Sequence, residues 1–202
     1  AHNQKYFEHN YLGTDSIDKT KRTSIKNTIG IALQEGFNKW AKAGLTAFLS
    51  YEYRNFALTD TTNIPGQRII NNYKESSLSI GGELSKKQGK LLHYNILGEL
   101  AIAGEDAGQF SVEGRGDLNL RLFGDTVRLD VNAFIKNQNP VFYFRHFQSK
   151  HYWWDNNDLS KIMRTRLEGK LSLDRWGTQL RAGVENIKNY TYLANTSIPV
   201  KD

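Results

Sequence analysis

Apolar and polar residues alternate with a period of two through most of this sequence, and that pattern limits how the chain can fold. Over residues 127–136 one parity holds Val127, Leu129, Val131, Ala133 and Ile135, and the other holds Arg128, Asp130, Asn132 and Lys136. Side chains at i, i+2 and i+4 share one face of a strand but spread around a helix. The alternation therefore predicts strands with one apolar and one polar face.

Eight segments carry this alternation, and we expect each to be a strand: 22–34, 43–54, 77–84, 92–102, 110–122, 127–136, 163–173 and 179–185. Most have about ten residues or more, the length that a tilted strand needs to cross a bilayer, whereas strands of soluble sheets usually have five or six. The apolar faces hold mainly Leu, Ile, Val, Ala and Gly, which lipid tolerates. The predicted fold class is all-β, an antiparallel transmembrane β-barrel or a segment of a larger one. A soluble sandwich or open barrel is the alternative.

The connections agree with a barrel of short periplasmic turns and longer external loops. We expect the periplasmic turns at Gly36–Ala41, Lys86–Gly89, Phe123–Thr126 and Asp174–Gly177. We also expect a single domain over 1–202, with a loop or partly ordered lead-in at 1–21 and the longest clear loop at 55–72.

An irregular aromatic stretch, NPVFYFRHFQSKHYWWDNN at 139–157, separates the sixth strand from the seventh. Because short turns precede and follow these two strands, we expect an external excursion over 139–158 with either no membrane-crossing strand or two. Tyr152, Trp153 and Trp154 are candidates to stack on a sugar ring or to form an interfacial aromatic girdle. Tyr51 and Tyr53, at the end of a predicted strand, fit the same girdle.

Charged residues recur in the middle of the strands on their polar faces. The candidates to line a lumen are Glu113, Arg115, Asp117, Arg121, Arg128, Asp130, Arg164, Arg166, Glu168 and Lys170. Mixed signs on facing strands would pair into a cross-strand ladder and tune ion passage. The alternative is a ladder that has no role in selectivity.

Composition and motifs argue against several other classes. The absence of Cys excludes disulfides and thiolate metal sites. The net charge of +6 is spread without a run of five like charges, so we expect no nucleic-acid partner. The spacing of His146, His151, Asp155 and Asp158 matches no common metal motif, and we expect neither a metal nor a cofactor. No Gly-x-Ser-x-Gly, paired-carboxylate motif or phosphate loop is present, so we expect no enzyme.

Three runs carry a resemblance to a known family: Leu33–Phe56, the aromatic stretch NPVFYFRHFQSKHYWWDN, and Val184–Leu193. They resemble the putative porin family of the Bacteroidota outer membrane. The resemblance implies a Gram-negative outer-membrane β-barrel in contact with lipid and lipopolysaccharide. Members of the family are normally longer, which implies that this chain is a segment whose partners include the remainder of the barrel and other outer-membrane subunits or lipoproteins.

Three functions stay open at this point. The first is a porin that passes small polar solutes through a charged lumen. The second is a structural barrel subunit of an uptake or secretion assembly whose lumen is plugged. The third is an exported, soluble carbohydrate-binding β-sheet protein.

Overall fold

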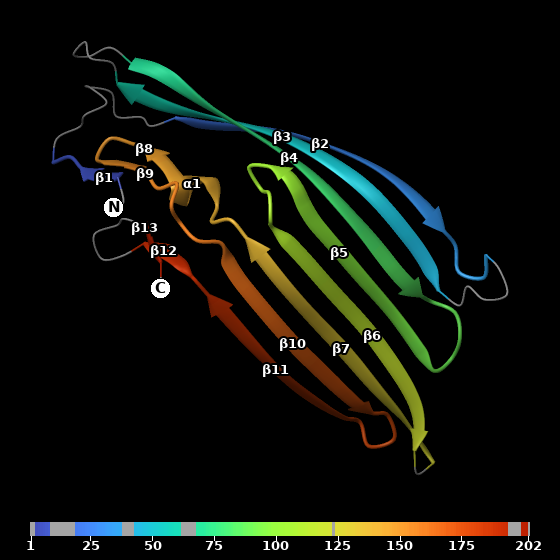
Figure 1. The fold of residues 1–202 in the computed structure, drawn as a ribbon. Helices are drawn as coiled ribbons and strands as arrows, with labels where there is room; N and C mark the ends of the chain where they lie inside the picture. The colour runs from blue at the N-terminus through green and yellow to red at the C-terminus, as the bar shows by residue number, and fades with distance from the viewer. Residues whose placement is uncertain are drawn as a thin grey trace.

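A long antiparallel sheet of eight strands dominates the computed structural model, which describes residues 3–8, 19–37, 43–61, 68–122, 124–193 and 199–201 (Figure 1). In spatial order its strands are β11 (Thr178–Lys188), β10 (Ile162–Leu173), β7 (Asp125–Gln138), β6 (Phe110–Leu122), β5 (Leu92–Gly104), β4 (Arg68–Lys86), β3 (Gly44–Thr61) and β2 (Thr20–Leu33). All eight predicted strands are confirmed, and so is the fold class. The sheet is open, as expected of a segment of a barrel.

The two faces of the sheet differ as the alternation predicts. Cross-strand register aligns Leu118, Leu129 and Leu171 in one row. The next row, on the opposite face, contains Asp117, Asp130 and Lys170. We call these the apolar face and the polar face. Large side chains of the apolar face lie uncovered, the most exposed being Ile29 at 77%.

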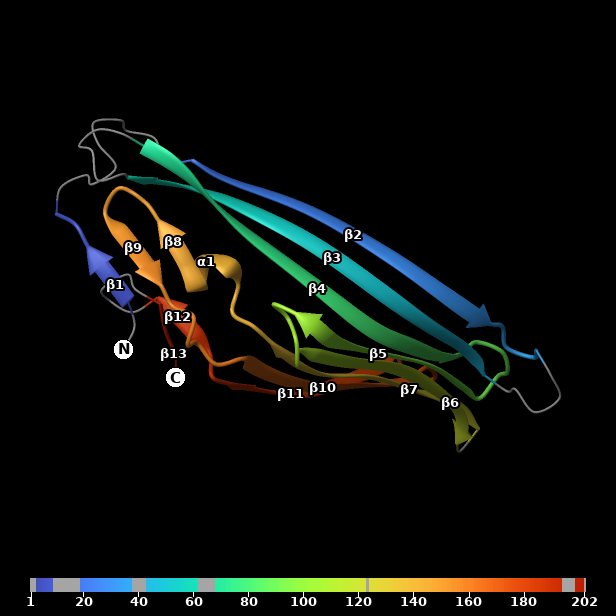
Figure 2. The ribbon, with the colours of Figure 1, turned by 45° about the horizontal axis from the view of Figure 1, so that its top comes forward.

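The sheet bends toward its polar face. Lys26 Nζ on β2 lies 3.7 Å from Glu99 Oε1 on β5, although β3 and β4 separate these strands. In a flat sheet the two backbones would be about 14 Å apart, at about 4.8 Å per strand. Figure 2 shows the result: β2–β4 form one limb and β7, β10 and β11 the other.

A small inner layer lies between the two limbs (Figures 1 and 2). It consists of α1 (Phe142–Arg145) and a three-stranded sheet in the order β1 (Asn3–Tyr6), β9 (Tyr152–Asp155) and β8 (His146–Gln148). Residues 139–157, here called the inner segment, supply all of this layer except β1. Close to the C-terminus, β12 (Thr191–Leu193) pairs with β13 (Pro199–Lys201).

One expectation about the connections was wrong. Residues 55–72 are mostly strand, because β3 runs to Thr61 and β4 begins at Arg68. Backbone ladder bonds do not need apolar side chains, and polar pairs fit the ladder here: Asn71 Nδ2 donates to Asp60 Oδ2 at 2.7 Å. The lead-in also contains a strand, β1, although residues 9–18 lie outside the described residues.

The antiparallel order puts the β2–β3, β4–β5, β6–β7 and β10–β11 connections at one end of the sheet, here called the turn end. The opposite end is the loop end. The turn at 174–177 is confirmed, with Gly177 N–H donating to Asp174 O at 3.2 Å. The turn expected at Phe123–Thr126 is shorter, because Asp125 already pairs with Leu122 in β7. Most of the Gly36–Ala41 turn lies outside the described residues.

Among the described residues, no helix is long and apolar enough to cross a membrane.

Candidate functional site

The inner segment packs on the polar face near the loop end through an aromatic cluster. The rings of Phe142 and Phe56 stack with centroids 3.8 Å apart and planes 4° apart. Tyr73 and Tyr143 meet Phe142 edge-on at 5.5 Å and 5.4 Å. Phe56 and Phe142 are each 5% exposed, and with Leu58 they form the buried hydrophobic cluster. On the polar face, β3 and β4 thus carry the apolar or aromatic residues Phe56, Leu58 and Tyr73, which form the surface that the inner segment packs on.

A buried ionic contact fastens the same segment. Arg145 is 7% exposed, and its two terminal nitrogens donate to Glu75 Oε1 at 2.7 Å and to Glu105 Oε1 at 2.8 Å. Its Nε donates to the carbonyl of Pro140 at 3.2 Å. A buried charge is costly unless it is paired and hydrogen-bonded, and buried Glu75 is paired with Arg145 and with Arg54, whose Nη2 lies 3.1 Å from Glu75 Oε2.

The turn between β5 and β6 folds onto the polar face and extends this network. It begins at Gly104, whose φ of +87° and close approach to the Ser76 carbonyl exclude a side chain. Asp106 Oδ2 then accepts hydrogen bonds from Arg54 Nη2 at 2.6 Å and from Ser77 Oγ at 2.7 Å. Burial raises the pKa of Asp106, but these two donors outweigh it and hold the pKa below its ordinary value of 3.8.

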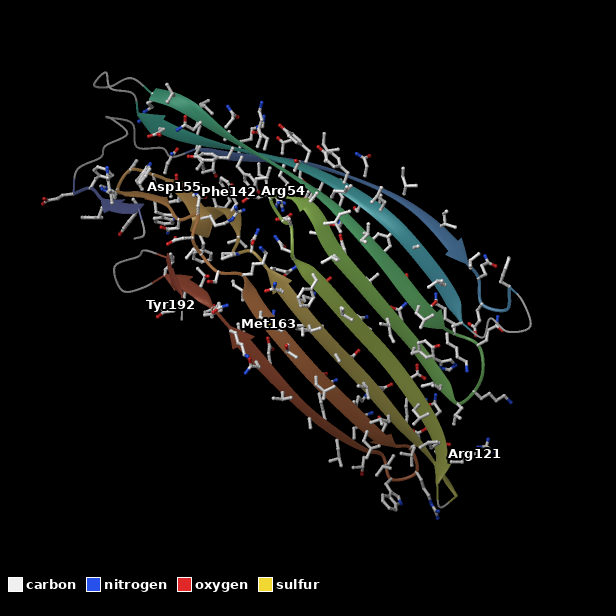
Figure 3. All side chains as sticks on the ribbon, viewed as in Figure 1. Arg54, Arg121, Phe142, Asp155, Met163 and Tyr192 are labelled. Carbon is white, nitrogen blue, oxygen red and sulfur yellow. The ribbon has the colours of Figure 1, made fainter. Side chains whose placement is uncertain are left out.

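His146 lies at the junction of the aromatic and ionic clusters. Its ring centroid is 4.9 Å from that of Tyr73, and its Nδ1 is 2.9 Å from Asp155 Oδ1. Burial lowers the pKa of His146 below 6.5 even though Asp155 opposes the shift, so the imidazole is neutral at pH 7. Figure 3 shows Arg54, Phe142 and Asp155 close to one another, with Arg121 at the far end of the sheet.

The aromatic candidates of β9 belong to this inner layer. Trp154 is 6% exposed, stacks on Phe147 at 4.7 Å and donates its Nε1–H to the carbonyl of Tyr143 at 3.0 Å. Trp154 is therefore a packing residue, and it does not fit the expected girdle or sugar-stacking role. Tyr152 packs against Tyr6 at 5.4 Å.

The remaining aromatic candidates have other surroundings. Lys5 Nζ lies 5.6 Å from the Trp153 ring. Tyr51 and Tyr53 occupy the apolar parity of β3, and Tyr51 is 47% exposed. Their position fits an interfacial girdle, which stays a prediction.

Register places all ten lumen candidates on the polar face, and several pair as a ladder. Glu113 lies 2.6 Å from Lys136, and Asp117 lies 2.8 Å from His93. Arg164 pairs with Glu185, and Arg166 lies 2.6 Å from Glu168. Arg128 donates to Asn119 at 3.1 Å. The ionic partners of the inner segment are instead Glu75 and Glu105, and Arg54 and Asp106 extend the same network.

Those partners were missed by sequence reasoning. Arg54 and Glu75 follow the ordinary polar parity of their strands, so nothing local distinguishes them. Arg145 did carry a signal, because it is the only Lys, Arg, Asp or Glu between Lys136 and Lys150 and lies within an aromatic run.

The described residues contain no group of three or more His, Asp or Glu side chains that could hold a metal ion. His146 contacts Asp155, whereas His151 lies away from both and bonds through Nδ1 to the carbonyl of Phe7 at 3.0 Å.

The polar face has several hollows, and two of them are lined mainly by charged and polar residues. One, of about 220 Å³, lies beside Arg54 and Asp106 and has a floor of small residues, among them Ser50 and Ser79. The other, of about 450 Å³, lies toward the turn end and is lined by Arg115, Asp117, Asp130, Glu168 and Lys170, among others.

Comparison with known proteins agrees with this geometry. A family model described as Putative porin matches residues 1–201, nearly the whole chain. No curated protein and no solved structure gives a match. A sheet with one uncovered apolar face and one charged face fits that family, and the chain belongs to the putative porin family.

Proposed function

We propose that this chain forms part of an outer-membrane β-barrel that passes small polar solutes through a charged lumen. Membership of a porin family supports an outer-membrane, channel-like role rather than catalysis. One observation carries the proposal: a single sheet has an uncovered apolar face, suited to lipid, and a charged opposite face, suited to water.

The barrel needs strands in addition to these eight. Every residue of the edge strands β2 and β11 is exposed, and unpaired backbone groups in lipid cost several kcal/mol each. An eight-stranded barrel has an interior just wide enough for side chains, whereas here a whole layer lies on the polar face. The chain's partners are therefore the remainder of the barrel together with lipid and lipopolysaccharide.

In this proposal the inner segment narrows the lumen near the loop end. Its position on the polar face, fastened by Arg145 to the wall and to the β5–β6 turn, supports that role. The ten charged candidates run along the wall from Arg164 near the loop end to Arg121 near the turn end, and their ladder sets the local field.

A plugged structural barrel is the second candidate function, and the same fastening favours it. A segment held by a buried ion pair and stacked rings resists displacement. The exported carbohydrate-binding alternative has less support, because the apolar face is far larger than the patches that soluble monomers expose.

Conductance tests the proposal. Full-length protein, shown to be folded by a heat-modifiable gel shift, is reconstituted in planar bilayers. We expect stepwise ion conductance, and a larger conductance for Arg145→Met, which loosens the inner segment. Silence from folded protein of both forms would support the plugged barrel and contradict the porin.

A further inference from the structure

Charges on the polar face are sorted by strand, and the edge strand β2 carries only the cations Arg22 and Lys26 there. Among the described residues of the β3–β5 polar face, the carboxylates are Glu52, Asp60, Glu75, Glu83 and Glu99, and the only Lys or Arg is Arg54. On β7, β10 and β11 the order reverses: the cations are Arg128, Lys136, Arg164, Arg166, Lys170 and Arg181, against Asp130, Glu168 and Glu185. We call these the acidic wall and the basic wall.

Strand β6 separates the two walls, and its own polar face carries equal numbers of acidic and basic residues. Its polar face carries Glu113 and Asp117 together with Arg115 and Arg121. Since β6 lies between β5 and β7, the sign of the wall changes across a single strand.

The acidic wall already holds cationic groups from other elements. Arg145 of the inner segment reaches Glu75, and Lys26 of β2 reaches Glu99. These contacts show that the wall accepts both a guanidinium and an ammonium group. Glu83 and Glu52 instead receive neutral donors, Asn95 Nδ2 and Ser24 Oγ, and keep their negative charge uncompensated by these partners.

The basic wall retains positive charge after its own pairing. Glu168 is shared by Arg166 at 2.6 Å and Arg181 at 3.7 Å. Arg128 contacts the neutral oxygen of Asn119. Two cations on one carboxylate, and one on an amide, leave a net attraction for a solute carboxylate.

The bend of the sheet turns the walls toward a common space. Strands β3 and β4 of the acidic wall belong to the β2–β4 limb, which faces the β7, β10 and β11 limb of the basic wall across the region between them (Figure 2). At physiological ionic strength charges act over about 8 Å before screening, so each wall acts on the part of a solute that passes within about that distance of it.

We propose that the polar face selects small zwitterionic solutes, such as amino acids and short peptides. The solute turns its ammonium group toward the acidic wall and its carboxylate toward the basic wall. This inference rests on the proposed function, because it names the class of solute that the lumen passes.

Uptake into proteoliposomes containing the full-length protein tests it. The probes are a zwitterionic dipeptide, its neutral N-acetylated amide and its two singly charged forms, which carry one blocked end each. We expect the zwitterion to enter fastest, by roughly two- to fivefold over the neutral form, the scale of one or two exposed ion pairs.

Wall variants make the assignment specific. Glu52→Gln with Glu83→Gln removes two of the five carboxylates of the acidic wall, and we expect the preference to move toward the form that carries only a carboxylate. Arg128→Gln with Lys170→Gln removes two of the six cations of the basic wall, and we expect the preference to move toward the form that carries only an ammonium group. Lys74→Gln is the control, because Lys74 is an exposed charge on the opposite parity of β4.

Three results would overturn the inference. Equal uptake of the four probes contradicts the inference and leaves the porin function intact. The same holds if both double variants keep the heat-modifiable shift and show an unchanged preference. Uptake of no probe by folded protein contradicts the porin function and the inference together.

Discussion

The edge strand β2 and the inner segment invert the usual relation between sequence and burial. Strand β2 alternates regularly, carries three Ile side chains on one face, and is exposed at all fourteen residues. The inner segment has an irregular sequence rich in polar groups, yet Phe142, Arg145 and Trp154 are among the most buried residues described.

The difference shows where this protein obtains its stability. The sheet buries little apolar surface within the chain, so its uncovered Ile, Leu and Val side chains need lipid on one side and further strands at the edges. The inner segment packs against the polar face of the sheet through its own rings and ion pairs, and this packing needs neither lipid nor further strands. Each prediction below changes one of these two regions and leaves the other intact.

The largest effect is expected in the inner segment. Arg145→Met removes the charged hydrogen bonds to Glu75 and Glu105, and we expect docking of the inner segment to lose about 3–5 kcal/mol although Arg54 still pairs with Glu75. Hydrogen exchange over residues 142–155 measures the loss. Arg166→Met is the control, because Arg166 is an exposed partner of Glu168 and its loss is expected to cost less than about 1 kcal/mol. Equal protection in both variants would mean that the buried pair does not hold the segment.

The next effect separates the two faces of the sheet. Leu129→Arg puts a charge on the apolar face, and we expect a loss of about 2–4 kcal/mol in folding into lipid if the position lies at mid-bilayer. Asp130→Asn, one residue along on the polar face, is expected to leave folding nearly unchanged. Urea titration of protein in vesicles measures both, and similar losses would show that the faces are assigned wrongly.

The smallest effect is a pH dependence confined to the inner segment. Because burial lowers the pKa of His146, the docked state binds a proton less readily than the undocked state. Docking is therefore fully stable above pH 6.5 and weakens below it, by up to about 1.4 kcal/mol at pH 5.5.

Hydrogen exchange at pH 7.5 and pH 5.5 checks this dependence, and His146→Gln is expected to remove it. Asp106 does not contribute in that interval, because its lowered pKa makes its stabilisation disappear only below about 3.8. A loss of the same size in the His146→Gln variant would assign the effect to another group.

Sequence alone predicted the sheet well because alternation is a local property. The residues of each strand are enough to predict its two faces, as they are in β7 from Val127 to Lys136, and all eight strands were predicted. Charged residues such as Arg115 and Lys170 were placed on the polar face for the same reason.

The inner layer could not be predicted, because its contacts join residues far apart in sequence. Arg145 and Glu75 are 70 residues apart, and His151 meets Phe7 across 144 residues. Phe56 and Leu58 occupy positions of β3 that lie on the polar face, so the alternation breaks there. For that reason the sequence predicted neither the extension of β3 nor the surface on which the inner segment packs.

The central claim, that the apolar face meets lipid and the polar face meets water, is tested most directly by single-cysteine labelling along β7. The chain has no Cys, so each introduced thiol reports alone. In protein reconstituted in vesicles, positions 128, 130 and 132 are expected to react with a water-soluble maleimide. Fluorophores at 127, 129 and 131 are expected to be quenched by a quencher dissolved in the lipid. Alternation between the two responses is the predicted result, and uniform labelling with no lipid quenching at any of the six positions would contradict the account.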